Sequence, residues 1–128
     1  MGEKITILYV EDNRDNRLLV RRVLNAEGID VMEAETAAQA LGELSQRVPD
    51  LILMDINLPE IDGYTLTQRL RQDPRLVGVP IIAMTANVMK GDRERTLDAG
   101  CDGYIQKPID VDLLPQQISH FLNEVGHE

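Results

Sequence analysis

The sequence predicts an α/β protein built on a parallel sheet, because short continuous apolar runs alternate with segments of helical periodicity. Four of the apolar runs end directly in polar residues. These runs cover residues 7–10, 51–54, 81–84 and 104–106. The polar residues that follow them are Glu11 and Asp12, Asp55, Thr85, and Lys107. All strand exits of a parallel sheet share one edge, and open α/β sheets bind ligands there, so we expect these side chains to converge on a site.

The first strand is followed by a helix that starts near Asp15 and stops at Gly28. Its apolar residues recur at helical spacing, and glycine suits the left-handed position just past a helix. The stripe consists of Leu19, Val20, Val23 and Leu24. A second strand is expected over residues 29–33.

Thr36 and Gln39 match a capping box, which predicts the start of the second helix. One apolar stripe follows at helical spacing, and the helix should end before Pro49. The residues of this stripe are Ala37, Ala40, Leu41, Leu44 and Val48. Residues 51–54 then form the third strand.

A third helix follows the turn at Asp62 and Gly63 and carries Leu66 and Leu70. It should end at Asp73, because the residue before a proline avoids helical geometry. Pro80 introduces the fourth strand.

The last part of the chain contains a weakly patterned helix over residues 92–99, stopped by Gly100, and a short strand near 103–106. In the final helix Pro115 fits only the first turn, which predicts Asp112 as the N-cap. Its expected buried stripe is Leu114, Ile118, Phe121, Leu122 and Val125.

Size and charge limit the possible functions. The 128 residues suit one domain over 1–128, and the net charge of −9 disfavours nucleic acid and anionic membranes as partners. No apolar stretch approaches the roughly 20 residues of a membrane helix, so we expect a soluble, cytoplasmic protein. The single cysteine, Cys101, is expected in a helix-to-strand turn rather than at a redox site.

The residues at the sheet edge suit phosphoryl transfer. Asp55 is the candidate nucleophile, and Mg²⁺ held by Glu11, Asp12 and Asp55 would offset the repulsion between two anions. Lys107 would bind a phosphoryl oxygen and Thr85 would donate a hydrogen bond to another. Taken singly, each residue has a plainer interpretation as a helix cap, a strand end or a surface charge. Taken together, an acid pair, an acid, a hydroxyl and a Lys-Pro pair at four exits of one sheet favour the site.

Six short motifs are spread over nearly the whole chain: Glu11-Asp12, residues 54–59, Asp62-Gly63, residues 84–86, residues 99–104 and Lys107-Pro108. Together they resemble the response-regulator receiver family. The resemblance implies a flavodoxin-like doubly wound sheet with five strands in the order 2-1-3-4-5 and five helices. Glu11 is a minor departure, because the acid pair of the family is often two aspartates.

This resemblance also implies roles. Asp55 would accept phosphate from a histidine kinase or a histidine phosphotransfer protein, with the Asn57 backbone carbonyl completing the magnesium ligands and Lys107 binding the phosphoryl group. Thr85 would move toward the phosphate and Tyr104 would change rotamer. The altered face, formed by the fourth helix, fifth strand and fifth helix, would bind a downstream protein. Taken alone, Tyr104 is better interpreted as a half-buried core aromatic, and only its position three residues before Lys107 favours a switch role.

Further positions would modulate the site. In the family, the residues at Asn57 and Asn87 influence the phosphoryl lifetime, and Ala86 and Pro108 flank the switch and the lysine. The isomer of the bond before Pro108 is left open by the sequence. The protein would not be an enzyme acting on a substrate, but would catalyse its own phosphorylation and dephosphorylation.

The leading hypothesis is a stand-alone receiver in two-component signalling. A receiver domain cut from a hybrid histidine kinase and a phosphate-independent binding module are the alternatives. A phosphatase of the haloacid-dehalogenase type would need a second acid where Asn57 stands. A flavin-binding relative would need a phosphate loop after the first strand, where Glu11, Asp12 and Asn13 would repel a phosphate.

Overall fold

A central sheet of parallel strands confirms the predicted fold class and strand order. The computed structural model describes residues 4–86 and 90–124. Within them, the sheet has the order β2-β1-β3-β4-β5, and every neighbouring pair is parallel. The strands are β1 (Thr6–Val10), β2 (Asp30–Ala34), β3 (Leu51–Asp55), β4 (Ile81–Thr85) and β5 (Gly103–Gln106).

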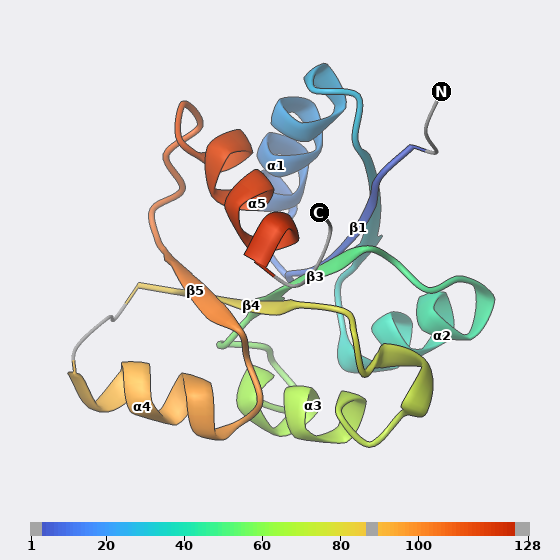
Figure 1. Ribbon diagram of the computed structural model, residues 1–128, viewed down its shortest axis with the longest axis vertical. Helices are drawn as coiled ribbons and strands as arrows, with labels where there is room; N and C mark the ends of the chain where they lie inside the picture. Colours follow the sequence, from blue (N-terminus) through green and yellow to red (C-terminus); the bar gives the residue numbers. More distant parts are fainter. Residues whose placement is uncertain (1–3, 87–89, 125–128) are drawn as a thin grey trace.

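Helices cover both faces of this sheet, as Figure 1 shows: α1 and α5 lie on one face, and α2, α3 and α4 on the other. A short 3-10 turn at Pro74–Leu76 precedes β4. The helices are α1 (Arg14–Ala26), α2 (Ala37–Gln46), α3 (Gly63–Leu70), α4 (Lys90–Asp98) and α5 (Leu114–Glu124).

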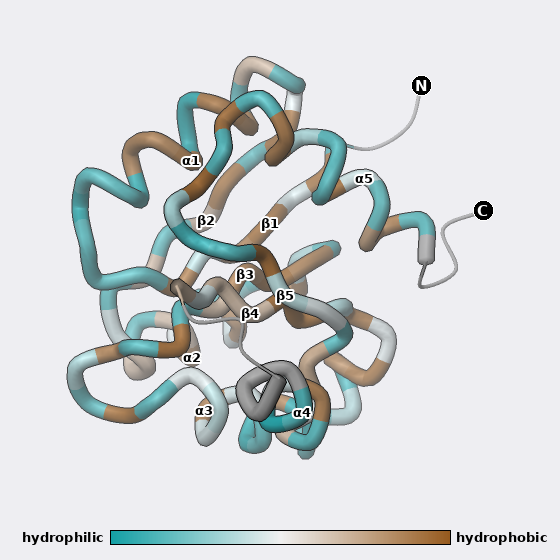
Figure 2. The backbone as a smooth tube through the Cα atoms, turned by 90° about the vertical axis from the view of Figure 1, so that its left-hand side faces the viewer, coloured by the Kyte–Doolittle hydropathy of each residue, from teal (hydrophilic) through white to brown (hydrophobic). Residues whose placement is uncertain are grey.

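Each face of the sheet carries its own apolar core, because successive strand residues point to opposite faces. In β1, Leu8 and Val10 pack into the core under α2 and α3. Ile7 and Tyr9 pack into the core under α1 and α5, beside Leu24 and Ile118. Figure 2 shows the hydrophobic stretches on the central strands and a mixed pattern on the helices. This arrangement explains why the central strands read as continuous apolar runs rather than alternating ones.

Local signals locate most element boundaries to within two residues. Gly28 has a φ of +80° directly after α1, and the Thr36 hydroxyl accepts a hydrogen bond from the Gln39 amide at the start of α2. Gly100, with a φ of +104°, follows α4. Cys101 is buried in the turn between α4 and β5, as predicted, and burial raises the pKa of its thiol to about 11.

The predicted apolar stripes were wrong in part, because some of their residues are exposed or only half-buried. Leu41 is 43% exposed because it lies one residue past Ala40, at the margin of the face that α2 turns to the sheet. Val48 is 42% exposed because α2 ends at Gln46, before it. In the final helix, Leu114, Ile118 and Leu122 are buried and Phe121 is half-buried, and Val125 lies outside the described residues.

The N-cap predicted before α5 was also wrong. The Asp110 carboxylate, rather than that of Asp112, accepts hydrogen bonds from the amides of Asp112 (3.0 Å) and Leu113 (3.3 Å). The turn that leads into α5 is therefore capped by Asp110, two residues before the Asp112 cap that the position of Pro115 predicted. Pro115 lies in the first turn of α5, as expected. In the described part of the chain, none of the helices combines the length and apolar character needed to cross a membrane.

Candidate functional site

Three carboxylates predicted at two strand exits meet at one point of the sheet edge. Glu11 and Asp12 directly follow β1, and Asp55 is the last residue of the adjacent β3. One oxygen from each of the three lies within 4.8 Å of the others. Glu11 and Asp55 are almost fully buried, at 1% and 2% exposed, whereas Asp12 is exposed.

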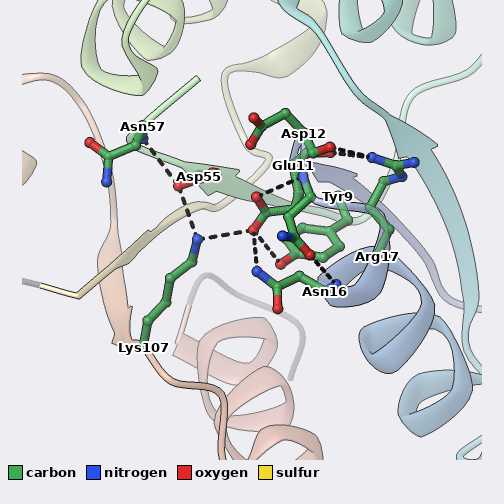
Figure 3. Close-up of polar contacts among 9 residues, drawn as sticks. Tyr9, Glu11, Asp12, Asn16, Arg17, Asp55, Asn57 and Lys107 are labelled. Atoms are coloured by element: carbon green, nitrogen blue, oxygen red, sulfur yellow. Dashed lines mark hydrogen bonds and ion pairs between the residues drawn. The ribbon is translucent and has the colours of Figure 1, made fainter. Parts of the chain in front are cut away.

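The Lys107 ammonium reaches this acid cluster from the end of β5. Its Nζ donates to Glu11 Oε1 at 3.0 Å and to Asp55 Oδ1 at 3.2 Å. Figure 3 shows the ammonium lying between the two carboxylates. The backbone amide of Lys107 donates to the carbonyl of Thr85 at 2.7 Å, which joins the exits of β4 and β5. The peptide bond between Lys107 and Pro108 is cis.

Burial and crowding of like charges shape the electrostatics. Burial, followed by the neighbouring Glu11 carboxyl, raises the pKa of Asp55 to about 6. Burial also acts to raise the pKa of Glu11, but hydrogen bonds with Asp55 and Lys107 outweigh it and hold that pKa below its usual value. For Lys107, burial is outweighed by its two carboxylate partners, and its pKa is raised. The site therefore holds more negative charge than one ammonium balances.

Helix α1 holds the backbone of the acid pair through Arg17, which sequence reasoning missed. Nη1 of Arg17 donates to the carbonyl oxygens of Glu11 (2.9 Å) and Asp12 (3.0 Å). Nε and Nη2 of the same guanidinium form ion pairs with Glu33 (3.4 Å) and Glu35 (3.5 Å), at the end of β2. In Figure 3 Arg17 approaches the loop from the side opposite Lys107. No sequence motif marks this residue, because the bonds by which it holds the acid pair go to backbone oxygens.

The Tyr9 and Asn16 side chains also converge on Glu11 and were not predicted. The Tyr9 hydroxyl donates to Glu11 Oε1 at 3.0 Å, and Asn16 Nδ2 contacts the same oxygen at 3.4 Å. The amide of Asn13 donates to Oε2 at 3.3 Å. The period-2 spacing of Tyr9 and Glu11 puts both on one face of the strand, which is a signal that the sequence does contain.

The connection from β3 to α3 fixes the backbone of Asp55. The Asn57 amide donates to Asp55 Oδ1 at 3.1 Å, and Asp62 caps α3 by accepting from the Thr65 amide at 2.9 Å. Gly63 donates to the Ile56 carbonyl at 2.9 Å. A Cβ on Gly63 would lie 2.8 Å from Ile56 Cα and would collide with the carbonyl oxygen of Asp55. Only glycine allows this close approach.

The other predicted residues that the structure describes differ in their exposure to solvent. Thr85, the last residue of β4, is 6% exposed, and Ala86 after it is exposed. Tyr104 on β5 is half-buried and packs against the core under α2 and α3. Asn87 lies outside the described residues.

The donor set fits a hard divalent cation. Carboxylate and carbonyl oxygens are the ligands that Mg²⁺ prefers, usually one or two carboxylates plus waters and phosphate oxygens. Burial is the main cause of the raised pKa of Asp55, and the adjacent Glu11 carboxyl adds to it; a cation would offset the negative charge of the two carboxylates. The exposed Asp12 leaves the cluster open to solvent on one side, so that a cation can enter.

The chain is similar to known proteins along most of its length. The family model of the response regulator receiver domain matches residues 7–119. The polar-differentiation response regulator DivK of Brucella abortus (strain 2308) is 40% identical over 119 residues, which cover 93% of this chain and 97% of DivK.

Solved structures agree with this match. The receiver domain of the sensor histidine kinase PA1611 from Pseudomonas aeruginosa PAO1, described with a magnesium ion coordinated in the active site cleft, has a TM-score of 0.85 and 36% identity, covering 94% of this chain and 99% of that one. Chemotaxis protein CheY4 of Vibrio cholerae shares the fold, with a TM-score of 0.89 at 22% identity over 93% of this chain and 99% of that one. The chain therefore belongs to the response regulator receiver family of two-component signalling.

Proposed function

We propose that this receiver takes a phosphoryl group onto Asp55 from a phosphohistidine of a histidine kinase or a histidine phosphotransfer protein. The observation that carries the proposal is the position of Lys107, whose Nζ lies 3.2 Å from Asp55 Oδ1. Glu11 and Asp12 complete the site within 4.8 Å. A nucleophile, a cation-binding acid pair and a fixed positive charge are the parts that phosphoryl transfer to a carboxylate requires.

In this reaction a carboxylate oxygen of Asp55 attacks the phosphorus, and the bond from phosphorus to the histidine nitrogen breaks with its electron pair leaving on the imidazole. A bound Mg²⁺, held by Glu11, Asp12, Asp55 and the Asn57 backbone carbonyl, would offset the repulsion between the carboxylate and the phosphoryl oxygens. Lys107 transfers its contact from the Asp55 carboxylate to a phosphoryl oxygen, and the Thr85 hydroxyl donates to another. The chain thus catalyses its own phosphorylation, and its dephosphorylation when a water molecule attacks the phosphorus and the bond from phosphorus to the Asp55 oxygen breaks, which releases inorganic phosphate and the free carboxylate.

The phosphate shifts the chain between two packings, which a partner distinguishes. Thr85 draws toward the phosphate, and the half-buried Tyr104 on the neighbouring strand changes rotamer. Asn57, Ala86, Asn87 and Pro108 modulate the rates. The output surface is the face of α4, β5 and α5, where Leu113 is 47% exposed beside a shallow cleft that includes Gln117.

Phosphodonor proteins would dock beside the site itself. A second shallow cleft contains Lys107 and is lined on its α1 side by Asn16 and Leu19. Leu19 is 38% exposed there. A partly apolar rim next to the nucleophile suits a helix of a phosphotransfer protein rather than nucleic acid or a membrane, which the net charge of −9 disfavours. We assign the whole chain, 1–128, to one cytoplasmic receiver unit.

The proposal is tested by incubating the protein with acetyl phosphate, with and without Mg²⁺, and measuring intact masses of wild type and Asp55→Asn. We expect one phosphoryl group on the wild type, only with Mg²⁺, and none on the variant. Phosphorylation of Asp55→Asn at the wild-type rate would show that the nucleophile is misassigned. A folded wild type that gains no phosphate, even from a phosphohistidine donor, would instead favour a phosphate-independent binding module.

A further inference from the structure

The Tyr9 side chain links the apolar core directly to the acid cluster. Its ring is fully buried beneath α1 and α5, and its hydroxyl donates to Glu11 Oε1 at 3.0 Å. Because the ring is packed on all sides, this donor is held in place by the core rather than by the surface.

The two oxygens of Glu11 have different partners. Oε1 accepts the Tyr9 hydroxyl and the Lys107 ammonium, both at 3.0 Å, and Asn16 Nδ2 at 3.4 Å. Oε2 accepts the Asn13 amide at 3.3 Å. A carboxylate oxygen has about two lone-pair sites, so the two donors at 3.0 Å, Tyr9 and Lys107, fill those of Oε1, and the longer Asn16 contact of 3.4 Å adds to an oxygen that is already saturated. Oε2 is then the oxygen with capacity left for a cation or for a water bound to it.

We propose that Tyr9 is a positioning residue of the phosphorylation site, acting through Glu11. Its hydroxyl fixes the Glu11 rotamer so that Oε1 anchors Lys107 while Oε2 faces the cation. This inference rests on the proposed magnesium site. It also accounts for glutamate at position 11: an aspartate is shorter by one carbon–carbon bond, about 1.5 Å, and would not reach the hydroxyl from the same backbone position.

The test is a double-mutant cycle of Tyr9→Phe and Glu11→Asp, with Mg²⁺ alone as the probe and calorimetry as the readout. Removing a residue that orients a metal ligand typically lowers the affinity for the metal. We therefore expect Tyr9→Phe to raise the Kd for Mg²⁺ about tenfold when residue 11 is glutamate, and less than about twofold in the Glu11→Asp background. The free energy of unfolding without Mg²⁺ is measured for all four proteins.

Tyr64→Phe is the matched control. The Tyr64 hydroxyl is also buried, 3.4 Å from Thr96 Oγ1, but it belongs to the core on the opposite face of the sheet. We expect it to leave the Mg²⁺ affinity at the wild-type value. A Tyr9→Phe protein that loses stability but keeps its Mg²⁺ affinity would overturn the positioning role, as would equal affinity losses in both backgrounds. A wild type that binds no Mg²⁺ would overturn the metal site itself, which is a distinct result.

Discussion

The ammonium nitrogen of Lys107 lies 3.0 Å from Oε1 of Glu11, although the two residues are 96 positions apart in the chain. The exits of β1 and β5 are thereby tied together across the sheet edge, with Asp55 between them. The lysine side chain is 18% exposed and its Glu11 partner 1% exposed, so this ion pair is largely shielded from water. Shielded pairs respond to the loss of one partner far more than surface pairs do.

Replacing Lys107 should therefore lower the stability of the chain. We expect Lys107→Ala to lower the free energy of unfolding by about 1–3 kcal/mol at pH 8, because two buried carboxylates lose their shared charged donor. Added Mg²⁺ should restore much of this loss, since a cation also offsets the excess charge. Urea unfolding with and without Mg²⁺ measures both effects. Lys4→Ala is the control, because its ion pair with Asp30 is 58% and 45% exposed and should contribute about 0–1 kcal/mol.

Asp55→Asn should stabilise the chain at alkaline pH in the absence of Mg²⁺. The pKa of Asp55 is raised to about 6 from an ordinary value of 3.8, so the folded chain binds this proton more tightly than the unfolded chain does. Its stabilising contribution is complete below about pH 4 and is lost as the pH rises through 6. Removing the ionisation should raise the free energy of unfolding by about 1–3 kcal/mol at pH 8 and by little near pH 4.5.

Urea unfolding at those two pH values measures the difference. Asp62→Asn is the opposite control: the Thr65 amide lowers the pKa of Asp62, so that ionised carboxylate contributes stability above its unfolded pKa. This second variant should lose stability at pH 8. An Asp55→Asn protein no more stable than the wild type at pH 8 would contradict the raised pKa of Asp55.

Gly63→Ala should disturb the proposed phosphorylation site through the backbone. The added Cβ would collide with the carbonyl oxygen of Asp55 and lie 2.8 Å from Ile56 Cα, so the loop after β3 must shift. We expect a loss of about 1–3 kcal/mol in the free energy of unfolding and slower phosphorylation by acetyl phosphate. Gly42→Ala is the control, since that glycine is exposed on α2 with nothing within 4 Å of an added Cβ. The Gly42→Ala variant should gain about 0.5–1 kcal/mol in the free energy of unfolding.

Arg17→Gln should weaken Mg²⁺ binding without removing any ligand. The guanidinium holds the carbonyl oxygens of Glu11 and Asp12 at 2.9 and 3.0 Å, and glutamine cannot form both bonds together with the ion pairs to β2. We expect a Kd for Mg²⁺ about tenfold higher by calorimetry. Arg21→Gln serves as the comparison, because Arg21 pairs with the same Glu33 at 2.7 Å but does not touch the acid pair. Equal effects in both variants would refute the role of Arg17.

Thr85→Ala should separate phosphorylation from switching. Thr85 is the last residue of β4, which pairs with β3, the strand that ends in Asp55. We expect the variant to accept phosphate from acetyl phosphate, while the phosphate-dependent change in the NMR signals of Tyr104 becomes smaller. Thr85→Ser, which keeps the hydroxyl, should retain the full change. Identical Tyr104 spectra for wild type and Thr85→Ala, each with and without phosphate, would rule out this coupling.

Most of the architecture could be predicted from local signals. Apolar runs of strand length, the Thr36 cap and the glycines at positive φ act within a few residues, and each locates an element boundary. Because parallel strands exit at one edge, the sequence also determined which elements bring Glu11, Asp12, Asp55, Thr85 and Lys107 to the same region. It failed before α5, where two aspartates two residues apart offer equivalent caps and only the path of the chain selects Asp110.

The tertiary structure alone decided how the site residues contact one another. The two acceptors of Lys107, the carbonyl oxygens held by Arg17 and the contact of Gly63 with the backbone of Asp55 all join segments from different elements. The packing of the sheet and helices buries Glu11 and leaves its sequence neighbour Asp12 exposed to solvent. The physical reason is that hydrogen bonds and desolvation depend on distances across the packed sheet and helices, and residue order along the chain does not specify those distances.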